Sequence, residues 1–221
     1  MKKKEAEVSI YDKIEELKKS ASWKEIIELV DQNIDNYRVD REMNGTICYQ
    51  FLDMLDYLYN CNCHFNGLEE LPNWAGNGEI ILIYEKAKAL KKLKKYEEAI
   101  SVIDSMIEVA PNTARFYLMK SEIALSQEDV IETENILKKA HKYIWRSNDF
   151  AIMLSHLACI AIIKENYDEA LAYASLALVH NKHNSVKTFA NNILNKVKNY
   201  KGNDDLYILD KYDAISYFTS H

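Results

Sequence analysis

Apolar residues recur at helical spacing along most of the chain, and residues 95–111 show the pattern most clearly. In this stretch, KYEEAISVIDSMIEVAP, Ala99 stands three residues after a tyrosine, and apolar side chains then return every three or four positions. That spacing predicts an amphipathic helix with one buried face. Pro111 ends the run, because proline has no amide hydrogen for the helical hydrogen-bond ladder.

The same pattern occurs at other points along the chain. Thr133, 34 residues after Ala99, opens a fainter copy, and Ala170, 71 residues after Ala99, opens a close one. Upstream, the segment WKEII has the same layout, with Ile26 at the alanine position. A helix-pair repeat of about 34 residues is characteristic of tetratricopeptide repeats. On these residues the sequence resembles the tetratricopeptide-repeat (TPR) family.

The resemblance implies an all-α fold, a right-handed α-solenoid of TPR-like antiparallel helix pairs. Because every apolar period is close to 3.6 residues, the sequence also predicts a chain that is helical throughout and contains no sheet. We expect divergent TPR-like helices in residues 1–78, three helix pairs plus a capping helix in 79–202, and a C-terminal tail in 203–221.

The periodicity predicts a third helix over Asp40–Asn60 and then fails. Residues 61–78 contain Pro72 and three glycines, so they predict an irregular loop in place of a helix. We expect the loop to brace the gap with Leu71 and Trp74 turned inward; a degenerate repeat with a short helix near 68–71 is the alternative. The expected buried face of the third helix consists of Ile47, Phe51, Met54, Leu55 and Leu58.

Charge and apolar content argue against a nucleic-acid-binding protein and a membrane protein. The formal net charge is −6, whereas a nucleic-acid-binding domain is usually basic. The sequence lacks a long uninterrupted apolar run and an apolar stretch after its first lysines, so it predicts neither a membrane span nor an export signal. A cytoplasmic protein with reduced cysteines is the expectation.

The sequence contains no catalytic signature that we recognise: no phosphate-binding glycine loop, no HExxH helix and no GxSxG elbow. We therefore predict a protein that is not an enzyme and needs no cofactor. Cys61, Cys63 and His64 are weak candidates for metal ligands. Their spacing matches no standard zinc finger, so we expect no metal there.

A stripe of lysines is the strongest functional signal. Lys88, Lys91, Lys92 and Lys95 follow the i, i+3, i+4, i+7 pattern of one helix face. In the TPR family the first helix of each pair lines a concave groove, and the resemblance places twelve residues of this chain there. They are Tyr84, Lys88, Lys91, Lys92, Arg115, Leu118, Met119, Glu122, Ile152, Ser155, His156 and Cys159.

From these residues we predict a scaffold or adaptor that binds a peptide or helix of another protein, with an acidic, amphipathic segment as the fitting partner. A peptide-sensing regulatory protein is one alternative, and a metal-dependent activity at loop 61–78 is another. The lysines could equally form a solvated helix face. The tail is expected to dock on the last helix pair or to form a homodimer, because it carries Leu206, Ile208, Leu209, Tyr212, Ile215 and Phe218.

Overall fold

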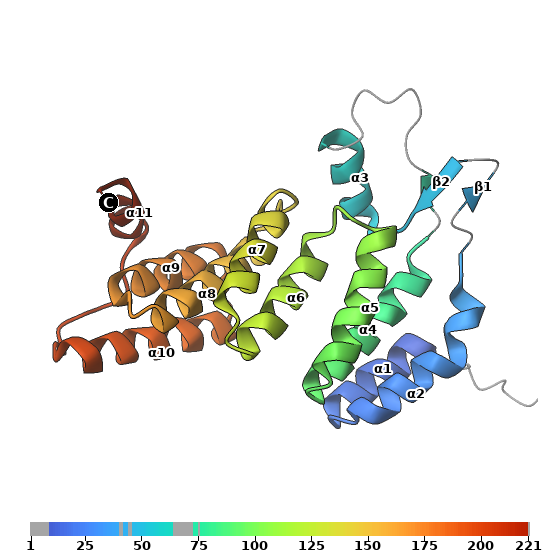
Figure 1. Cartoon of the computed structure of the whole chain (residues 1–221), viewed down its shortest axis with the longest axis horizontal. Coiled ribbons are helices and arrows are strands. Elements are labelled where there is room, and N and C mark those ends of the chain that lie inside the picture. Colours follow the sequence, from blue (N-terminus) through green and yellow to red (C-terminus); the bar gives the residue numbers. More distant parts are fainter. Residues whose placement is uncertain (1–8, 40–41, 44–45, 64–72, 75, 221) are drawn as a thin grey trace, which may run out of the picture. The chain divides into compact units, whose positions relative to one another are not determined.

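The computed structural model describes residues 9–39, 42–43, 46–63, 73–74 and 76–220. Helices account for most of them, as the sequence predicts (Figure 1). The chain divides into two compact units, Met1–Thr113 and Ala114–His221. The boundary expected between residues 78 and 79 therefore falls inside the first unit.

The first unit is organised around α1, α2 and α4, which share one apolar core. Its buried members are Ile10 and Ile14 of α1, Ile26 and Val30 of α2, and Leu82 and Ala89 of α4. The elements of this unit are α1 (Ile10–Lys19), α2 (Trp23–Asn33), the 3-10 helix η1 (Ile34–Tyr37), β1 (Glu42–Met43), β2 (Thr46–Tyr49), α3 (Met54–Cys63), β3 (Asn73–Trp74), α4 (Gly78–Lys92) and α5 (Tyr96–Val109).

In the described residues of the second unit, all regular secondary structure is helical. Small side chains let α8 and α9 approach closely, since Ala158, Ala170 and Ala174 are all fully buried between them and α10. The helices are α6 (Ala114–Ser126), α7 (Val130–His141), α8 (Ser147–Ile163), α9 (Tyr167–His180), α10 (Asn184–Lys201) and α11 (Lys211–Ser220).

Four helix pairs are joined by the same short turn. In each turn one residue other than glycine has a left-handed backbone: Ala21 (φ 55°), Lys94, Glu128 and Glu165 (each φ 59°). The next N–H donates to the carbonyl five residues back: Ser22 to Leu17, Lys95 to Leu90, Asp129 to Ala124 and Asn166 to Ala161, at 2.8–3.0 Å. Together with a bond spanning three residues, this is the Schellman arrangement, which satisfies the last carbonyls of a helix. The pairs α1–α2, α4–α5, α6–α7 and α8–α9 are therefore equivalent hairpins.

The four positions singled out by the sequence pattern are confirmed as core positions. Ile26 is 1% exposed, and Ala99, Thr133 and Ala170 are fully buried. Each N–H donates to the carbonyl of the last turn residue before its helix. The sequence therefore located the start of the second helix in every hairpin.

The prediction for residues 40–60 is wrong in two respects. Residues 46–49 form β2, and helix α3 starts only at Met54, where Asp53 Oδ1 accepts from the N–H groups of Leu55 and Asp56. Phe51 is buried as expected, but α3 is turned so that Met54, Leu55 and Leu58 are 52%, 57% and 47% exposed. Ile47 has no described side chain.

The expectation of a chain without sheet is also wrong. β1 pairs antiparallel with β2, with Met43 opposite Thr46, and β2 pairs parallel with β3, with Cys48 opposite Asn73. The three strands are two to four residues long, too short to alternate visibly in the sequence. Of the predicted loop 61–78, residues 61–63 belong to α3 and 73–74 to β3. The expectations for Leu71, for the Trp74 side chain and for a short helix at 68–71 lie outside the described residues.

The C-terminal tail docks on the helices that precede it in the same chain. Leu206, Ile208 and Leu209 pack on the core of α8, α9 and α10, and the Leu209 N–H donates to Ser175 Oγ at 3.1 Å. Helix α11 packs on α9, with Ala214 fully buried. This confirms the docking that its apolar residues predicted.

The left-handed turn residues generate a stability prediction. A residue with a Cβ is strained at positive φ by about 1–2 kcal/mol, and glycine is not. After the greater unfolded-state entropy of glycine is subtracted, Lys94→Gly should raise the free energy of unfolding by about 0.5–1 kcal/mol. The matched control is Lys196→Gly within α10, which should lower it by about 1 kcal/mol. Urea unfolding measures both; a destabilising Lys94→Gly would contradict the turn geometry.

Docking of the tail predicts a contrast between neighbouring residues of α11. Ala214→Glu would place an unpaired carboxylate in a fully buried site, so it should lower the free energy of unfolding by about 1–3 kcal/mol. Ile215→Glu adds the same charge at a position that is 41% exposed and should have little effect. Thermal unfolding of the two variants checks this, and equal melting temperatures would show that α11 is not held on α9.

Candidate functional site

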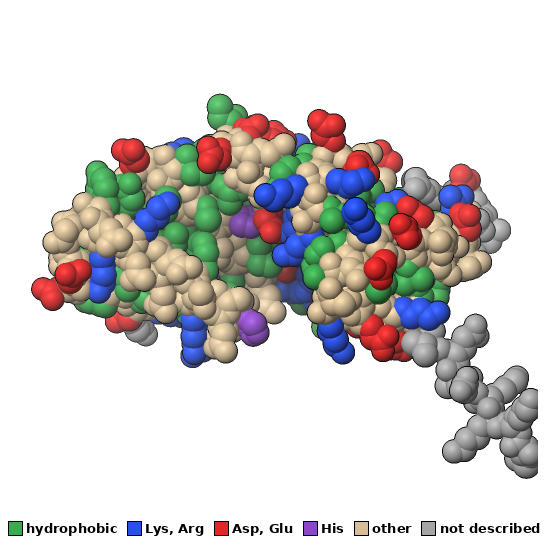
Figure 2. Space-filling model, turned by 90° about the horizontal axis from the view of Figure 1, so that it is seen from below, with side chains coloured by type: hydrophobic (Ala, Val, Ile, Leu, Met, Phe, Trp, Pro, Cys, Tyr) green, Lys and Arg blue, Asp and Glu red, His purple; other side chains and the backbone are tan. Residues whose placement is uncertain are grey.

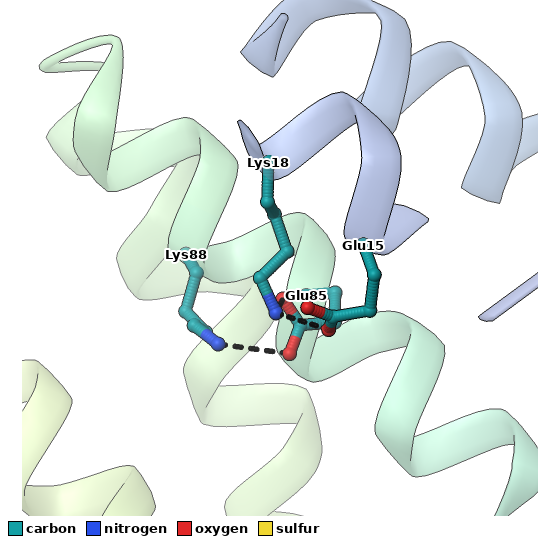
Figure 3. A network of polar contacts seen from close by, with 4 residues as sticks. All are labelled: Glu15, Lys18, Glu85 and Lys88. Carbon is teal, nitrogen blue, oxygen red and sulfur yellow. Dashed lines mark hydrogen bonds and ion pairs between the residues drawn. The ribbon is translucent and has the colours of Figure 1, made fainter. Parts of the chain in front are cut away.

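Two lysines of the predicted stripe, Lys88 of α4 and Lys95 in the turn after it, form ion pairs within the first unit, while Lys92 is exposed. Lys88 Nζ lies 2.8 Å from Glu85 Oε1 and 5.2 Å from the ring centre of Tyr84. Glu85 also accepts from Lys18 of α1 at 3.3 Å, and Lys18 lies 2.5 Å from Glu15 (Figure 3). Two lysines thus alternate with two carboxylates across the contact between α1 and α4.

Electrostatics within this network favour its charged form. The hydrogen bond from Lys18 lowers the pKa of Glu15 despite some desolvation. Burial alone would lower the pKa of Lys18, but its contacts with Glu15 and Glu85 raise it overall. At the other end of the stripe Lys95 pairs with Glu98 at 2.9 Å. Acidic and basic side chains are both present on the face drawn in Figure 2. The carboxylates of Glu85 and Glu98 offset the charges of Lys88 and Lys95.

The candidate residues of α6 mostly serve the interior. Leu118 and Met119 are 3% and 5% exposed, so the expectation that they line an open surface is not met. Arg115 Nε lies 3.2 Å from the buried Asp149 Oδ1 of α8. Glu122 is exposed.

His156 of α8 also lies in the interior, contrary to expectation. It is 8% exposed, and its Nδ1 lies 2.8 Å from Ser121 Oγ of α6. Ser121 Oγ donates its hydrogen to the Leu118 carbonyl, so it accepts a hydrogen bond from the Nδ1–H of His156. The pair thus links α6 to α8. The Ser121 side chain is fully buried, so its hydroxyl is not exposed to solvent.

The other α8 candidates, Ile152, Ser155 and Cys159, lie on one side of the helix together with Ile163, which was not among the predicted residues. These four residues are defined here as the α8 face. Ile152 and Ile163 are 41% and 44% exposed, although both side chains are apolar. Burial raises the pKa of the Cys159 thiol, and the Lys196 ammonium opposes this shift. A thiol with a raised pKa is a poor nucleophile and behaves as a small apolar group. Of the predicted set, this is the part that the structure leaves accessible as an apolar surface.

The candidate metal ligands do not converge within the described residues. Cys61 is buried and Cys63 is exposed, because residues two apart on a helix point to nearly opposite sides. His64 lies outside the described residues. In the part of the chain that the structure describes, no three histidine, cysteine, aspartate or glutamate side chains group as a metal site, and none of the helices has the length and hydropathy of a bilayer span.

No protein-family model matches this chain, and a search of curated protein sequences returns no match. Its function is therefore inferred from the arrangement of its own residues.

The ion pair between α6 and α8 yields a prediction. The Asp149 side chain is 6% exposed and that of Arg115 is 31% exposed. Arg115→Gln would leave a buried carboxylate without its cation, which should lower the free energy of unfolding by about 1–3 kcal/mol. Adding Asp149→Asn should recover most of the loss, because the buried charge is then gone. Lys142→Gln, an exposed lysine, is the control. Urea unfolding measures the free energies. If Arg115→Gln and Lys142→Gln have the same free energy of unfolding, the ion pair does not stabilise the fold.

Proposed function

We propose that this chain is a non-catalytic adaptor that binds a peptide or helix of another protein on the α8 face. The observation that carries the proposal is the exposure of Ile152 and Ile163, three helical turns apart on one side of α8. Exposed apolar side chains gathered on one surface typically mark an interaction site. With Ser155 and Cys159 between them, the face offers apolar contact and one hydroxyl.

The opposite side of α8 supports this proposal because it holds the helix in place. Leu154, Ala158 and Ala161 are 0–4% exposed and pack on α9 and its neighbours. A helix fixed in this way presents the α8 face without a further ordering cost on binding, which favours affinity. The proposed partner segment binds mainly by apolar contact, since Ile152 and Ile163 are the exposed large side chains of this face.

The repeated hairpins support a TPR-type array as the scaffold for this face. The turn residues Lys94, Glu128 and Glu165 recur at intervals of 34 and 37 residues, close to the TPR period. We extend the proposal to a right-handed solenoid that works in the cytoplasm. A peptide-sensing regulator would use the same surface, and it would be distinguished by a small peptide that co-purifies with the protein.

Charge placed on the α8 face should abolish partner binding. We compare the double variant Ile152→Glu/Ile163→Glu with Ile131→Glu/Val179→Glu, which adds the same charges at positions that are 75% and 36% exposed on α7 and α9. Affinity capture from native extract with quantitative mass spectrometry should show partners lost at least about tenfold, ~1.4 kcal/mol, from the first variant only. Thermal unfolding confirms that both variants fold. Equal recovery of the same proteins by both would overturn the proposal.

A further inference from the structure

A groove of about 400 Å³ lies between α7 and α8, within the second unit. The α7 residues that line it follow the i, i+3, i+4, i+7 pattern of one helix face. The α8 residues are one turn apart. The lining consists of Glu134, Leu137, Lys138 and His141 from α7 and Met153 and Leu157 from α8.

This groove is separate from the α8 face. At 3.6 residues per turn, Met153 and Leu157 are rotated by about a third of the circumference from Ile152 and Ile163. A segment lying on one surface therefore leaves the other free.

The inner part of the groove is apolar. Leu137 and Met153 are 3% and 6% exposed and belong to the core shared by α6, α7 and α8. Leu157 packs on the same core. The volume of the groove lies near the lower end of the range for ligand pockets, about 300–1,000 Å³. The groove therefore has room for a few aliphatic side chains. Methionine adapts its shape to different apolar ligands.

Lys138 gives the rim of the groove a positive charge, and His141 beside it adds a polar ring. Glu134 is paired with Lys164, the residue that follows α8, so its charge is offset. Lys138 and His141, by contrast, form no ion pair within the part of the chain that the structure describes. Both belong to the last turn of α7. An apolar interior with this rim complements aliphatic side chains that are followed by carboxylates.

We propose that the α7–α8 groove is a second protein-binding site, which takes two aliphatic side chains of a partner segment whose next residues are acidic. The carboxylates lie against Lys138 and His141, and the aliphatic groups against Leu137, Met153 and Leu157. The site extends the proposed function, but it does not depend on the α8 face.

The test uses the full chain and two synthetic peptides. One peptide carries two leucines three positions apart followed by three glutamates, and the other replaces the glutamates with lysines. NMR of methionine methyl groups should show a shift at Met153 on adding the acidic peptide, and none at Met106, which is fully buried in the first unit. Fluorescence anisotropy at low salt should give the acidic peptide an affinity at least about tenfold higher than that of the lysine peptide, and added salt should narrow this gap.

Three variants test whether the preference for the acidic peptide arises in the groove. Lys138→Glu should remove the preference for the acidic peptide, whereas Lys139→Glu, an exposed neighbour outside the lining, should keep most of it. Ile152→Glu/Ile163→Glu should bind the acidic peptide as the unchanged chain does. The proposal is overturned if Met153 does not respond, if both peptides bind equally, or if Lys139→Glu acts like Lys138→Glu. It also fails if the α8 double variant loses the peptide, a result that would instead support the α8 face.

Discussion

The hairpin turn with one left-handed residue is the constraint on which the rest of this structure depends. Ala21, Lys94, Glu128 and Glu165 adopt a backbone that costs about 1–2 kcal/mol for a residue with a Cβ. The helix-ending hydrogen bonds that follow fix where the second helix begins. That start places Ile26, Ala99, Thr133 and Ala170 at buried positions, and thereby orients the second helix of each pair.

The sequence allowed part of this fold to be predicted. Small or branched residues at the four packing positions are a local pattern, so the hairpins could be found from spacing. The turns could not, because the residues with positive φ are alanine, lysine and glutamate in place of glycine. Residues 46–49 were misread as helix because their structure depends on pairing with residues 42–43 and 73–74, which a helical apolar pattern does not reveal.

The candidate site could be predicted less well, because exposure depends on packing partners from other helices. Ile152 is exposed and Ser155 and Cys159 are half-buried, whereas His156, one position from Ser155, turns toward Ser121 of α6 and is buried. Lys88 looked like a free cation, but Glu85 and Lys18 share its network. Pairing with Glu85 offsets the charge of Lys88, and the exposed isoleucines of α8 are apolar. The proposed adaptor would recognise its partners by apolar side chains and use charge to orient them.

The most direct test of this account is the backbone conformation of the four turn residues in solution. Three-bond couplings between the amide and α protons, together with Cα chemical shifts, distinguish left-handed from helical residues. Couplings and shifts typical of a left-handed backbone are expected at Ala21, Lys94, Glu128 and Glu165 alike. Helical or averaged values at these positions would show that the helix pairs are not closed by one shared turn, and would remove the basis for the open α8 face.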